Sequence, residues 1–448
     1  MDYNEEQRIL QLIENKEYIQ LKKELSEMIE VDIAEILDSL DPQTTLLIFR
    51  MLDKDMAVDV FSNFSPEQQR SIINSVSDLE LEEIIDELFF DDMIDLLEEM
   101  PANLVNKILT SSTNEERALI NEFLKYPQDS AGSIMTIEYV DLKANMTVKD
   151  AMDHIKETGL TRETIYTTYV TDNNRKLKGI VSLRKLVVSE DYELISDLML
   201  EDFLYVHTHD DQEEVANLFT RYGFLALPVV DKEDRLTGII TVDDILEISE
   251  QEATEDFQLM AAMAPSEAAY LNTPVFTLAR QRILWLLVLM VTATFTGRIM
   301  ARYESVLESV VILSIFIPML MDTGGNSGNQ SSTLIIRGLA TGEIEIRDWY
   351  KVLFKEVKVS IIVAIILSIV NFGRLTLFEQ VDGAIALVVS ITLVITVITS
   401  KIVGSMLPMA AKVIKLDPAI MAGPLITTIV DTLSLIVYFV IASNLLNI

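Results

Sequence analysis

The chain has 448 residues, a formal net charge of −35 and no cysteine, and half of its residues are hydrophobic. This length is too great for one ordinary domain, and the lack of cysteine excludes disulfides, thiolate metal sites and a cysteine nucleophile. The large excess of acidic residues argues against a nucleic-acid partner, which needs a basic surface, and suits cations instead.

The acidic and the apolar residues lie in different parts of the chain. Residues 1–280 contain 59 acidic residues against 23 Lys and Arg, whereas residues 281–448 contain 11 against 12 and hold the long apolar runs. We therefore expect one part in water and the other in lipid. The first residues are acidic and include no apolar stretch of the kind found in a secretory signal, so we expect the N-terminus to be cytoplasmic.

Residues 1–130 contain a repeat that predicts a stack of short helices. The stretch 36–40 (Ile-Leu-Asp-Ser-Leu) returns 48 residues later as 84–88 (Ile-Ile-Asp-Glu-Leu), and Asp-Pro and Ser-Pro pairs interrupt the helical spacing of the apolar residues. Repeated helix pairs stack on one another into a superhelix. We therefore expect an acidic, α-helical superhelical domain over residues 1–130.

Residues 131–252 contain a second repeat, which predicts two copies of an α/β unit. The stretches 169–172 and 177–182 align with 228–231 and 236–241 at a constant shift of 59 residues. In both copies a strand, a charged turn, a strand that contains an early glycine and a helix follow one another. This pattern resembles a tandem pair of CBS domains, a regulatory module that binds adenine nucleotides or metals between its halves.

One stretch of the second copy fits a nucleotide site. CBS domains that hold ribose and phosphate often show Gly-apolar-x-Ser/Thr-x-x-Asp, and residues 238–244 provide it with Thr241 and Asp244. The first copy has Lys185 where the acid belongs. ATP binding at the second copy is therefore one interpretation. The other is that Thr241 only caps the following helix while Asp244 is solvated.

Acidic residues crowd two stretches, 86–99 and 243–256. A run of charge is usually a solvated face. Two such faces that meet would repel each other by about 1 kcal/mol per pair of charges at 4 Å in water, and by more near a protein surface. Divalent cations between the faces would remove this repulsion and draw the domains together, so the pattern also predicts a metal sensor.

Residues 253–280 are the covalent connection from the cytosolic part to the apolar part, and Pro265 and Pro274 interrupt them. A passive tether is one interpretation of this linker. The other is a helix that transmits a signal.

Five segments of residues 281–448 are apolar enough to cross a bilayer, which takes about 20 helical residues. They are roughly 283–301, 306–321, 359–377, 383–411 and 418–446. The second is short and continues into 322–330 (Asp-Thr-Gly-Gly-Asn-Ser-Gly-Asn-Gln). We expect irregular backbone there at membrane depth, with glycine carbonyls facing an ion; a polar surface loop is the alternative.

The positive charges predict the orientation of these five segments. With a cytoplasmic N-terminus, the inside segments carry nine basic residues and the outside segments three, in agreement with the positive-inside rule. The nine are Arg280, Arg282, Arg337, Arg347, Lys351, Lys355, Lys358, Lys412 and Lys415, and the three are Arg298, Arg302 and Arg374. An odd number of spans places the C-terminus on the extracellular or periplasmic side.

Asp431 is the charged residue of the last segment, and a charge inside a membrane is a candidate functional group. Thr427, Thr428 and Ser434 lie within about one turn of it. Alternatively, Asp431 is protonated or paired with Lys401. All three histidines precede the apolar part, so the segments offer oxygen ligands alone, which suit hard cations such as Mg²⁺, Ca²⁺ or Mn²⁺.

The order of these parts resembles the MgtE family of magnesium channels over essentially the whole chain. The most specific motifs are 318–337, from Pro318 through the Gly-rich stretch to Arg337, and 424–431 (Pro-Leu-Ile-Thr-Thr-Ile-Val-Asp). The resemblance implies a multidomain membrane protein: residues 1–130 the N domain, 131–252 the tandem CBS pair, 253–280 a plug helix and 281–448 a five-helix transmembrane pore. It also implies a homodimer in the plasma (inner) membrane.

The family also implies roles for single residues. Asp431 of each subunit would hold hydrated Mg²⁺, and backbone oxygens of the stretch containing Gly325, Gly328 and Asn329 would complete the filter. Cytosolic Mg²⁺ would bind acidic residues and close the pore through the plug helix. This expected sensor set is Asp59, Asp91, Asp92, Asp95, Asp243, Asp244, Glu247, Glu252, Glu255 and Asp256.

Other functions are less compatible with the sequence. A membrane zinc protease needs His-Glu-x-x-His, and no histidine follows His209, so we do not expect an enzyme. A chloride channel with CBS domains would need more spans and an anion filter. A proton- or sodium-coupled secondary transporter of a divalent cation remains the alternative, with Asp431 as carrier of the coupling proton; the five segments show no inverted repeat, which weakens it.

Overall fold

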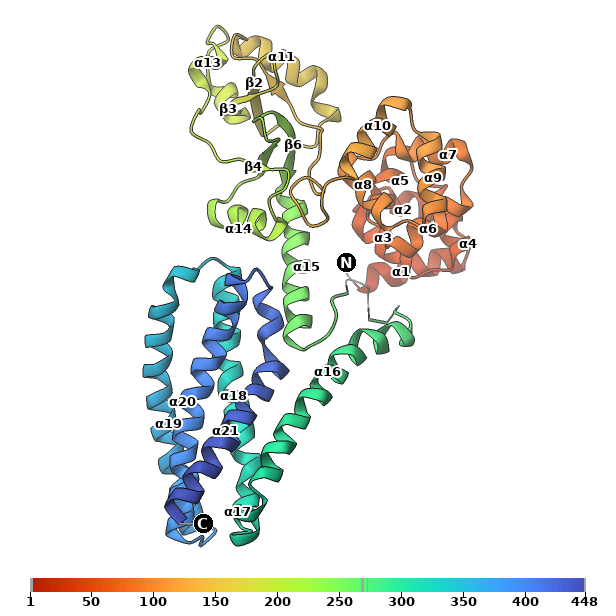
Figure 1. The fold of residues 1–448 in the computed structure, drawn as a ribbon. Coiled ribbons are helices and arrows are strands. Elements are labelled where there is room, and N and C mark those ends of the chain that lie inside the picture. Colours follow the sequence, from red (N-terminus) through yellow and green to blue (C-terminus); the bar gives the residue numbers. More distant parts are fainter. Residues whose placement is uncertain (1–2, 267–269, 272, 447–448) are drawn as a thin grey trace. The chain divides into compact units, whose positions relative to one another are not determined.

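The computed structural model describes residues 3–266, 270–271 and 273–446. The chain divides into two compact units, Met1–Leu246 and Glu247–Ile448, whose ribbons are shown in Figure 1. The first unit contains the helical and the α/β repeats, and the second contains the long apolar helices.

Short helices fill the first part of unit 1, which confirms the stack predicted from the repeat. Helix α3 packs on α5, α4 on α6 and α7 on α9. Asp41 caps α4 by accepting hydrogen bonds from the amides of Gln43 and Thr44, and a capping box of Ser77 and Glu80 begins α7. The helices are α1 (Tyr3–Glu14), α2 (Tyr18–Leu25), α3 (Glu30–Asp38), α4 (Pro42–Phe49), α5 (Lys54–Ser62), α6 (Pro66–Ser75), α7 (Asp78–Ile85), α8 (Phe90–Glu99), α9 (Ala102–Ser111) and α10 (Asn114–Phe123).

Two three-stranded sheets make up the rest of unit 1, with the orders β1-β2-β3 and β4-β5-β6. In each sheet the first pair is parallel and the second antiparallel. The strands are β1 (Asp141–Leu142), β2 (Thr167–Thr171), β3 (Leu177–Ser182), β4 (Val206–His207), β5 (Ala226–Val230) and β6 (Leu236–Thr241), and the helices are α11 (Val148–Thr158), η1 (Gly159–Thr161), α12 (Leu183–Val188), α13 (Ile195–Leu198) and α14 (Gln212–Tyr222).

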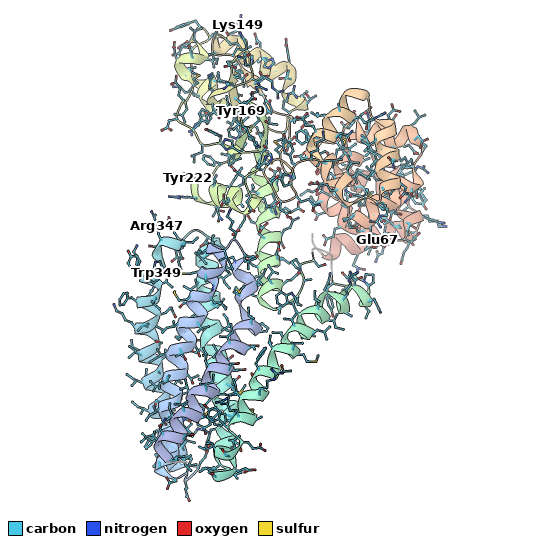
Figure 2. All side chains as sticks on the ribbon, in the orientation of Figure 1. Glu67, Lys149, Tyr169, Tyr222, Arg347 and Trp349 are labelled. Carbon is cyan, nitrogen blue, oxygen red and sulfur yellow. The ribbon has the colours of Figure 1, made fainter. Side chains whose placement is uncertain are left out.

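The two sheets exchange the segments that precede them. Thr136, ahead of the first copy, pairs with Ile239 of β6, whereas Leu200, ahead of the second copy, pairs with Ile180 of β3. Gly238 allows the first approach, because a Cβ there would lie 2.5 Å from the carbonyl oxygen of Thr136. Tyr169 is fully buried on β2 among residues of both copies (Figure 2).

The linker departs from the expectation of a single helix over 253–280. Helix α15 (Val242–Met260) begins directly after β6 and passes through the expected boundary at 252/253 without a break. It ends at Met260, where Ala262 takes a positive φ of 54°, and the next helix begins at Val275 after Pro274. The described linker is therefore the end of one helix, a loop and the start of another.

Long helices make up unit 2. They are α16 (Val275–Arg302), α18 (Leu313–Ala340), α19 (Trp349–Leu377), α20 (Gly383–Val413) and α21 (Gly423–Leu446), with short α17 (Glu304–Ser309), η2 (Ile346–Asp348) and η3 (Pro418–Met421) between them. Among the described residues, three segments are long and apolar enough to cross a membrane: Val275–Arg302, Gly383–Val413 and Pro418–Leu446. Helices α18 and α19 have 28 and 29 residues, but the count of five spans stays a prediction.

The expected irregular backbone at 322–330 is wrong. These residues lie in the middle of continuous helix α18, so their carbonyls belong to a helical hydrogen-bond ladder. The glycines serve helix packing instead. Gly328 of α18 and Gly404 of α20 face each other so closely that a Cβ on Gly404 would overlap the Gly328 carbonyl, which is the role small residues have between membrane helices.

Candidate metal centres

Two carboxylates from different helices of unit 2 lie close enough to interact electrostatically. Asp431 lies half-buried on α21, and Asp322 on α18 is exposed and close enough to act on it electrostatically. One turn away the same two helices meet again, because a Cβ on Gly325 would lie 2.9 Å from the Thr427 methyl group. The Asp431 motif and the Gly-rich motif therefore form one surface.

This surface offers cation ligands that differ from the predicted ones. Gly325 and Gly328 contribute helical backbone, not the open carbonyls that were expected. Asn329 contributes a side chain: its Oδ1 is buried and accepts no hydrogen bond from the described residues. Asp322 was not among the predicted ligands, because it begins a stretch that looks like a loop. Carboxylate and amide oxygens are ligands for hard divalent cations.

Lys401 does not neutralise Asp431 in this structure. The Lys401 ammonium is buried and donates a hydrogen bond to Ser331 Oγ at 3.3 Å. Ser331 in turn donates to Glu356 Oε2 at 2.6 Å. Among the described residues no ion pair involves Asp431, so the alternative of an Asp431–Lys401 pair has no support here.

A cluster of acidic residues forms in unit 1 around Asp91 of α8. Burial raises the pKa of Asp91 well above its usual range, and the negative charge of Asp244 raises it further. Burial, followed by the charge of Asp244, raises the pKa of Glu163 to about 7. Asp92 contributes to both shifts and Asp243 to that of Glu163. Acidic residues from the helical and the α/β parts thus face one another.

Glu163 is the member of this cluster that the sequence did not reveal. It lies between η1 and β2, outside both acidic runs. Among the described residues, no three His, Cys, Asp or Glu side chains are close enough to hold a metal ion together. The acidic residues of this cluster concentrate negative charge, therefore, without forming a closed ligand cage.

The remaining predicted sensor residues are not among the groups that raise the pKa of Asp91 or Glu163. Burial, followed by the charge of Glu30, raises the pKa of Asp59 on α5. Asp95 lies one turn after Asp91 on α8.

In unit 2, burial and then the charge of Asp417 raise the pKa of Asp256 to about 6. Glu252 and Glu255 add to this shift, and exposed Glu247 accepts a hydrogen bond from Gln251 at 3.4 Å.

Within the units, the predicted sensor residues gather around different carboxylates: around Asp59 and, with Asp244, around Asp91 in the first unit, and around Asp256 in the second. Their role as a sensor stays a prediction. Asp417, which precedes η3, is a further acidic residue that the sequence did not single out.

Thr241 and Asp244 form a helix cap. Thr241 Oγ1 donates to Asp244 Oδ2 at 2.6 Å, and the Thr241 amide contacts the same oxygen at 3.4 Å. In these contacts the Asp244 carboxylate accepts from the residue that precedes α15, which is one half of a capping box. Neither interpretation of the motif is settled by them. Asp244 is nevertheless not simply solvated, because it also faces Asp91 and Glu163.

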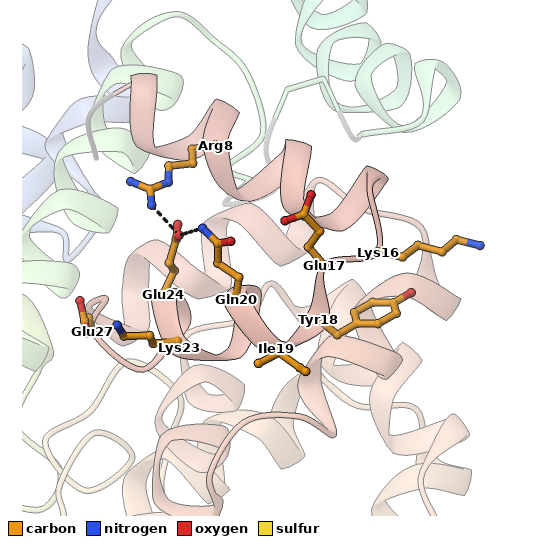
Figure 3. Close-up of a pocket in the computed structure, with 9 residues that line it drawn as sticks. All are labelled: Arg8, Lys16, Glu17, Tyr18, Ile19, Gln20, Lys23, Glu24 and Glu27. Carbon is orange, nitrogen blue, oxygen red and sulfur yellow. Dashed lines mark hydrogen bonds and ion pairs between the residues drawn. The ribbon is translucent and has the colours of Figure 1, made fainter.

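A hollow of about 780 Å³ lies between α1 and α2, away from these acidic groups (Figure 3). Glu24 accepts hydrogen bonds there from Arg8 Nη2 at 2.6 Å and from Gln20 Nε2 at 3.0 Å. The negative charge of Glu24 is thus neutralised by Arg8 within the hollow, and we assign no ligand to this hollow.

Three family models match the chain. The MgtE model, described as a divalent cation transporter, matches residues 317–441, the MgtE intracellular N domain matches 28–129, and the CBS domain matches 131–189 and 195–250. The Thermus thermophilus magnesium transporter MgtE is 37% identical over 95% of both chains. The Bacillus subtilis magnesium transporter MgtE is 32% identical over 93% of this chain and 94% of its own.

Solved structures resemble about half of the chain. The soluble part of a magnesium transporter is 32% identical with a TM-score of 0.52, and covers 56% of this chain and 98% of its own. The cytosolic domain of the Mg²⁺ channel MgtE in complex with ATP is 34% identical with a TM-score of 0.51, and covers 54% of this chain and 98% of its own.

Proposed function

Because the chain belongs to the MgtE family, a family of membrane transporters and not of enzymes, we propose that it is a Mg²⁺-selective channel of the plasma membrane. Relatives named magnesium transporters match it over nearly its whole length. The observation that carries the proposal is the pair of electrostatically interacting carboxylates, Asp431 and Asp322, on two helices of the apolar unit.

In this proposal the cation passes beside Asp431. Mg²⁺ gives up its water reluctantly, so a pore can hold the hydrated ion through a carboxylate and a few polar groups. Asp322, the Asn329 side chain and the stretch around Gly325 and Gly328 would complete the lining. A homodimer would bring two copies of Asp431 to one axis, where a divalent ion offsets the cost of two unneutralised charges in the membrane.

Cytosolic Mg²⁺ is proposed to close the channel. The raised pKa values of Asp91 and Glu163 reflect acidic groups whose charge is costly when no cation is near. Binding of Mg²⁺ among them would stabilise the close approach of the helical part to the CBS pair. Asp256, Glu252 and Glu255, with Asp417, would form a second regulatory group. Helix α15 connects the two groups within one continuous element.

ATP is proposed as a further ligand of the CBS pair, because a related cytosolic domain has been solved with ATP and Thr241 and Asp244 match the motif. The proposed topology has five spans, with a cytoplasmic N-terminus and an extracellular or periplasmic C-terminus.

The alternative is a proton- or sodium-coupled secondary transporter of a divalent cation. A membrane carboxylate with a second carboxylate nearby, as Asp431 has in Asp322, is also suited to carrying a coupling proton.

One experiment separates the two functions. The purified chain would be reconstituted in liposomes and recorded by single-channel patch clamp with Mg²⁺ as the permeant cation, while Mg²⁺ on the cytosolic side is raised from about zero to several millimolar. We expect unitary currents that close as cytosolic Mg²⁺ rises. Tracer uptake of Mg²⁺ without unitary currents, and only with a proton or sodium gradient, would establish the coupled transporter instead.

A further inference from the structure

A groove of about 860 Å³ lies between α16 and α21, on the second unit alone. Its walls include Phe295 of α16 and Leu425, Ile429 and Leu433 of α21, so most of the lining is apolar. Phe295 is 55% exposed and Leu433 37% exposed. In the most apolar stretch of α16, no residue is buried within the chain. The groove therefore needs an apolar occupant.

Two arginines lie at one part of this apolar groove. Arg298 and Arg302 both line it, and their spacing of four residues places them on one face of α16. Both are exposed, and the ion pairs among the described residues include neither of them. Acidic residues are likewise absent from the described lining of the groove. The groove thus combines an apolar wall with two positive charges that no carboxylate of the described chain neutralises.

The chemistry that satisfies both features is an anionic headgroup attached to apolar chains. A guanidinium in a membrane helix is costly unless it reaches the interface or a counter-ion. Arginine forms two parallel hydrogen bonds to a phosphate, and two arginines one turn apart can hold one phosphate between them. The apolar wall that continues along α21 fits an acyl chain.

We propose that the groove between α16 and α21 is a binding site for an anionic phospholipid, whose headgroup contacts Arg298 and Arg302 and whose acyl chain lies along Ile429 and Leu433. The site differs from ordinary lipid contact in its selectivity for negative headgroups. Leu433 is two residues from Asp431 on the same helix, so the bound lipid would contact the element that carries the proposed pore carboxylate. The lipid site itself does not depend on which ion crosses the membrane.

Native mass spectrometry of the full-length chain in detergent tests this inference. Phosphatidylglycerol and phosphatidylcholine with identical acyl chains would be titrated separately, and bound lipids would be counted. We expect the Arg298→Gln/Arg302→Gln double variant to lose the preference for phosphatidylglycerol, with about tenfold weaker binding of the first lipid. Its thermal stabilisation by phosphatidylglycerol should fall as well.

The matched control is Arg347→Gln/Lys351→Gln. This control also removes two positive charges, but from side chains that already form ion pairs. Arg347 pairs with Glu345 and Lys351 with Asp348, both at 2.6 Å. This control should keep the preference for phosphatidylglycerol. Equal preference in the double variant and in the control overturns the proposal. A double variant that changes the oligomeric state while its lipid binding is unchanged also overturns it, and makes the groove a contact between copies of the chain.

A second measurement keeps the proposal testable if the double variant does not fold. Trp285 and Trp349, the two native tryptophans, would be replaced by Phe and Ile429→Trp introduced with both arginines intact. Phosphatidylglycerol with brominated acyl chains should quench this tryptophan at lower mole fractions than brominated phosphatidylcholine does. Identical quenching curves would contradict a selective site.

Discussion

Gly404 of α20 packs against the backbone of Gly328 of α18, with no room for a side chain between them. The two helices also enclose buried Ser331 and Lys401, which hydrogen bond to each other. Close backbone contact of this kind holds membrane helices together where no hydrophobic driving force operates between them.

The first prediction concerns this contact. Gly404→Ala should destabilise unit 2 by about 2 kcal/mol or more, because the methyl group must displace backbone and not a flexible side chain. Thermal unfolding of the purified chain in detergent measures the effect. Gly373→Ala on α19 is the control, since a Cβ there meets no atom within 4 Å; it should leave the unfolding temperature unchanged or raise it. Equal effects of the two variants would show that the contact is not tight.

The second prediction concerns the proposed ion path. Asp431→Asn should reduce Mg²⁺ flux into liposomes by about tenfold or more, because it removes the charge that attracts a divalent ion at the membrane interior. Asp322→Asn should reduce flux less, since its carboxylate is exposed. Glu308→Gln removes an exposed acidic residue of α17 and should leave flux unchanged. Normal flux in Asp431→Asn would remove this residue from the path.

The third prediction is a pH dependence of channel closing. In the folded chain the pKa of Glu163 is raised from 4.5 to about 7. Its negative charge therefore costs stability in full above pH 7, and this cost decreases as the pH falls through 7 and is gone below about pH 4.5. At pH 6 the Glu163 side chain of the folded chain is already mostly protonated. Protonation also removes a charge that favours Mg²⁺. The Mg²⁺ concentration that half-closes the channel should therefore rise several-fold between pH 8 and pH 6.

Glu163→Gln separates this site from other titrating groups. The variant should need more Mg²⁺ for closing at pH 8, and its dependence on pH should be weaker than that of the unaltered chain. Glu157→Gln, on the exposed surface of α11, should behave as the unaltered chain does. If all three proteins shift equally with pH, Glu163 is not the titrating group.

The fourth prediction concerns the helix cap at Thr241. Thr241→Val should cost about 1 kcal/mol, because the Thr241 hydroxyl can no longer donate to Asp244 at the start of α15. It should also weaken ATP binding if the motif contacts ribose or phosphate. Isothermal titration with ATP on the full-length chain checks the second effect. Thr237→Val on the same strand is the control, since the Thr237 hydroxyl donates to Arg235 O at 3.3 Å, a bond that does not involve the start of α15. Unchanged ATP affinity in Thr241→Val would leave this residue with the capping role alone.

The repeats allowed the fold of the first unit to be predicted in detail. The shift of 59 residues that aligns the two copies also relates their strand pairs, since Thr167 pairs with Ser182 and Ala226 with Thr241. Here both the alternation of side chains and the turn residues occur twice, so each copy supports the interpretation of the other.

The Gly-rich stretch and Glu163 could not be interpreted from the sequence in the same way. Glycine disfavours helices in water, which made 322–330 look irregular, whereas a membrane requires internal hydrogen bonds and rewards small residues at helix contacts. That misreading also concealed Asp322 as a partner of Asp431. Glu163 lies in a connection without periodicity, and only the folded chain brings it to Asp244.

In the pair of α/β repeats, the segment that precedes each copy pairs with the sheet of the other copy. This exchange has a consequence for how the pair is inherited. Thr136 completes the edge of the second sheet and Leu200 that of the first, so a single copy cut out by a deletion would carry its neighbour's edge segment and lack its own. Loss or shuffling of one copy alone therefore leaves one uncovered sheet edge and one leading segment without its partner strand. Gene rearrangements are expected to retain the two copies together, as one indivisible unit of inheritance.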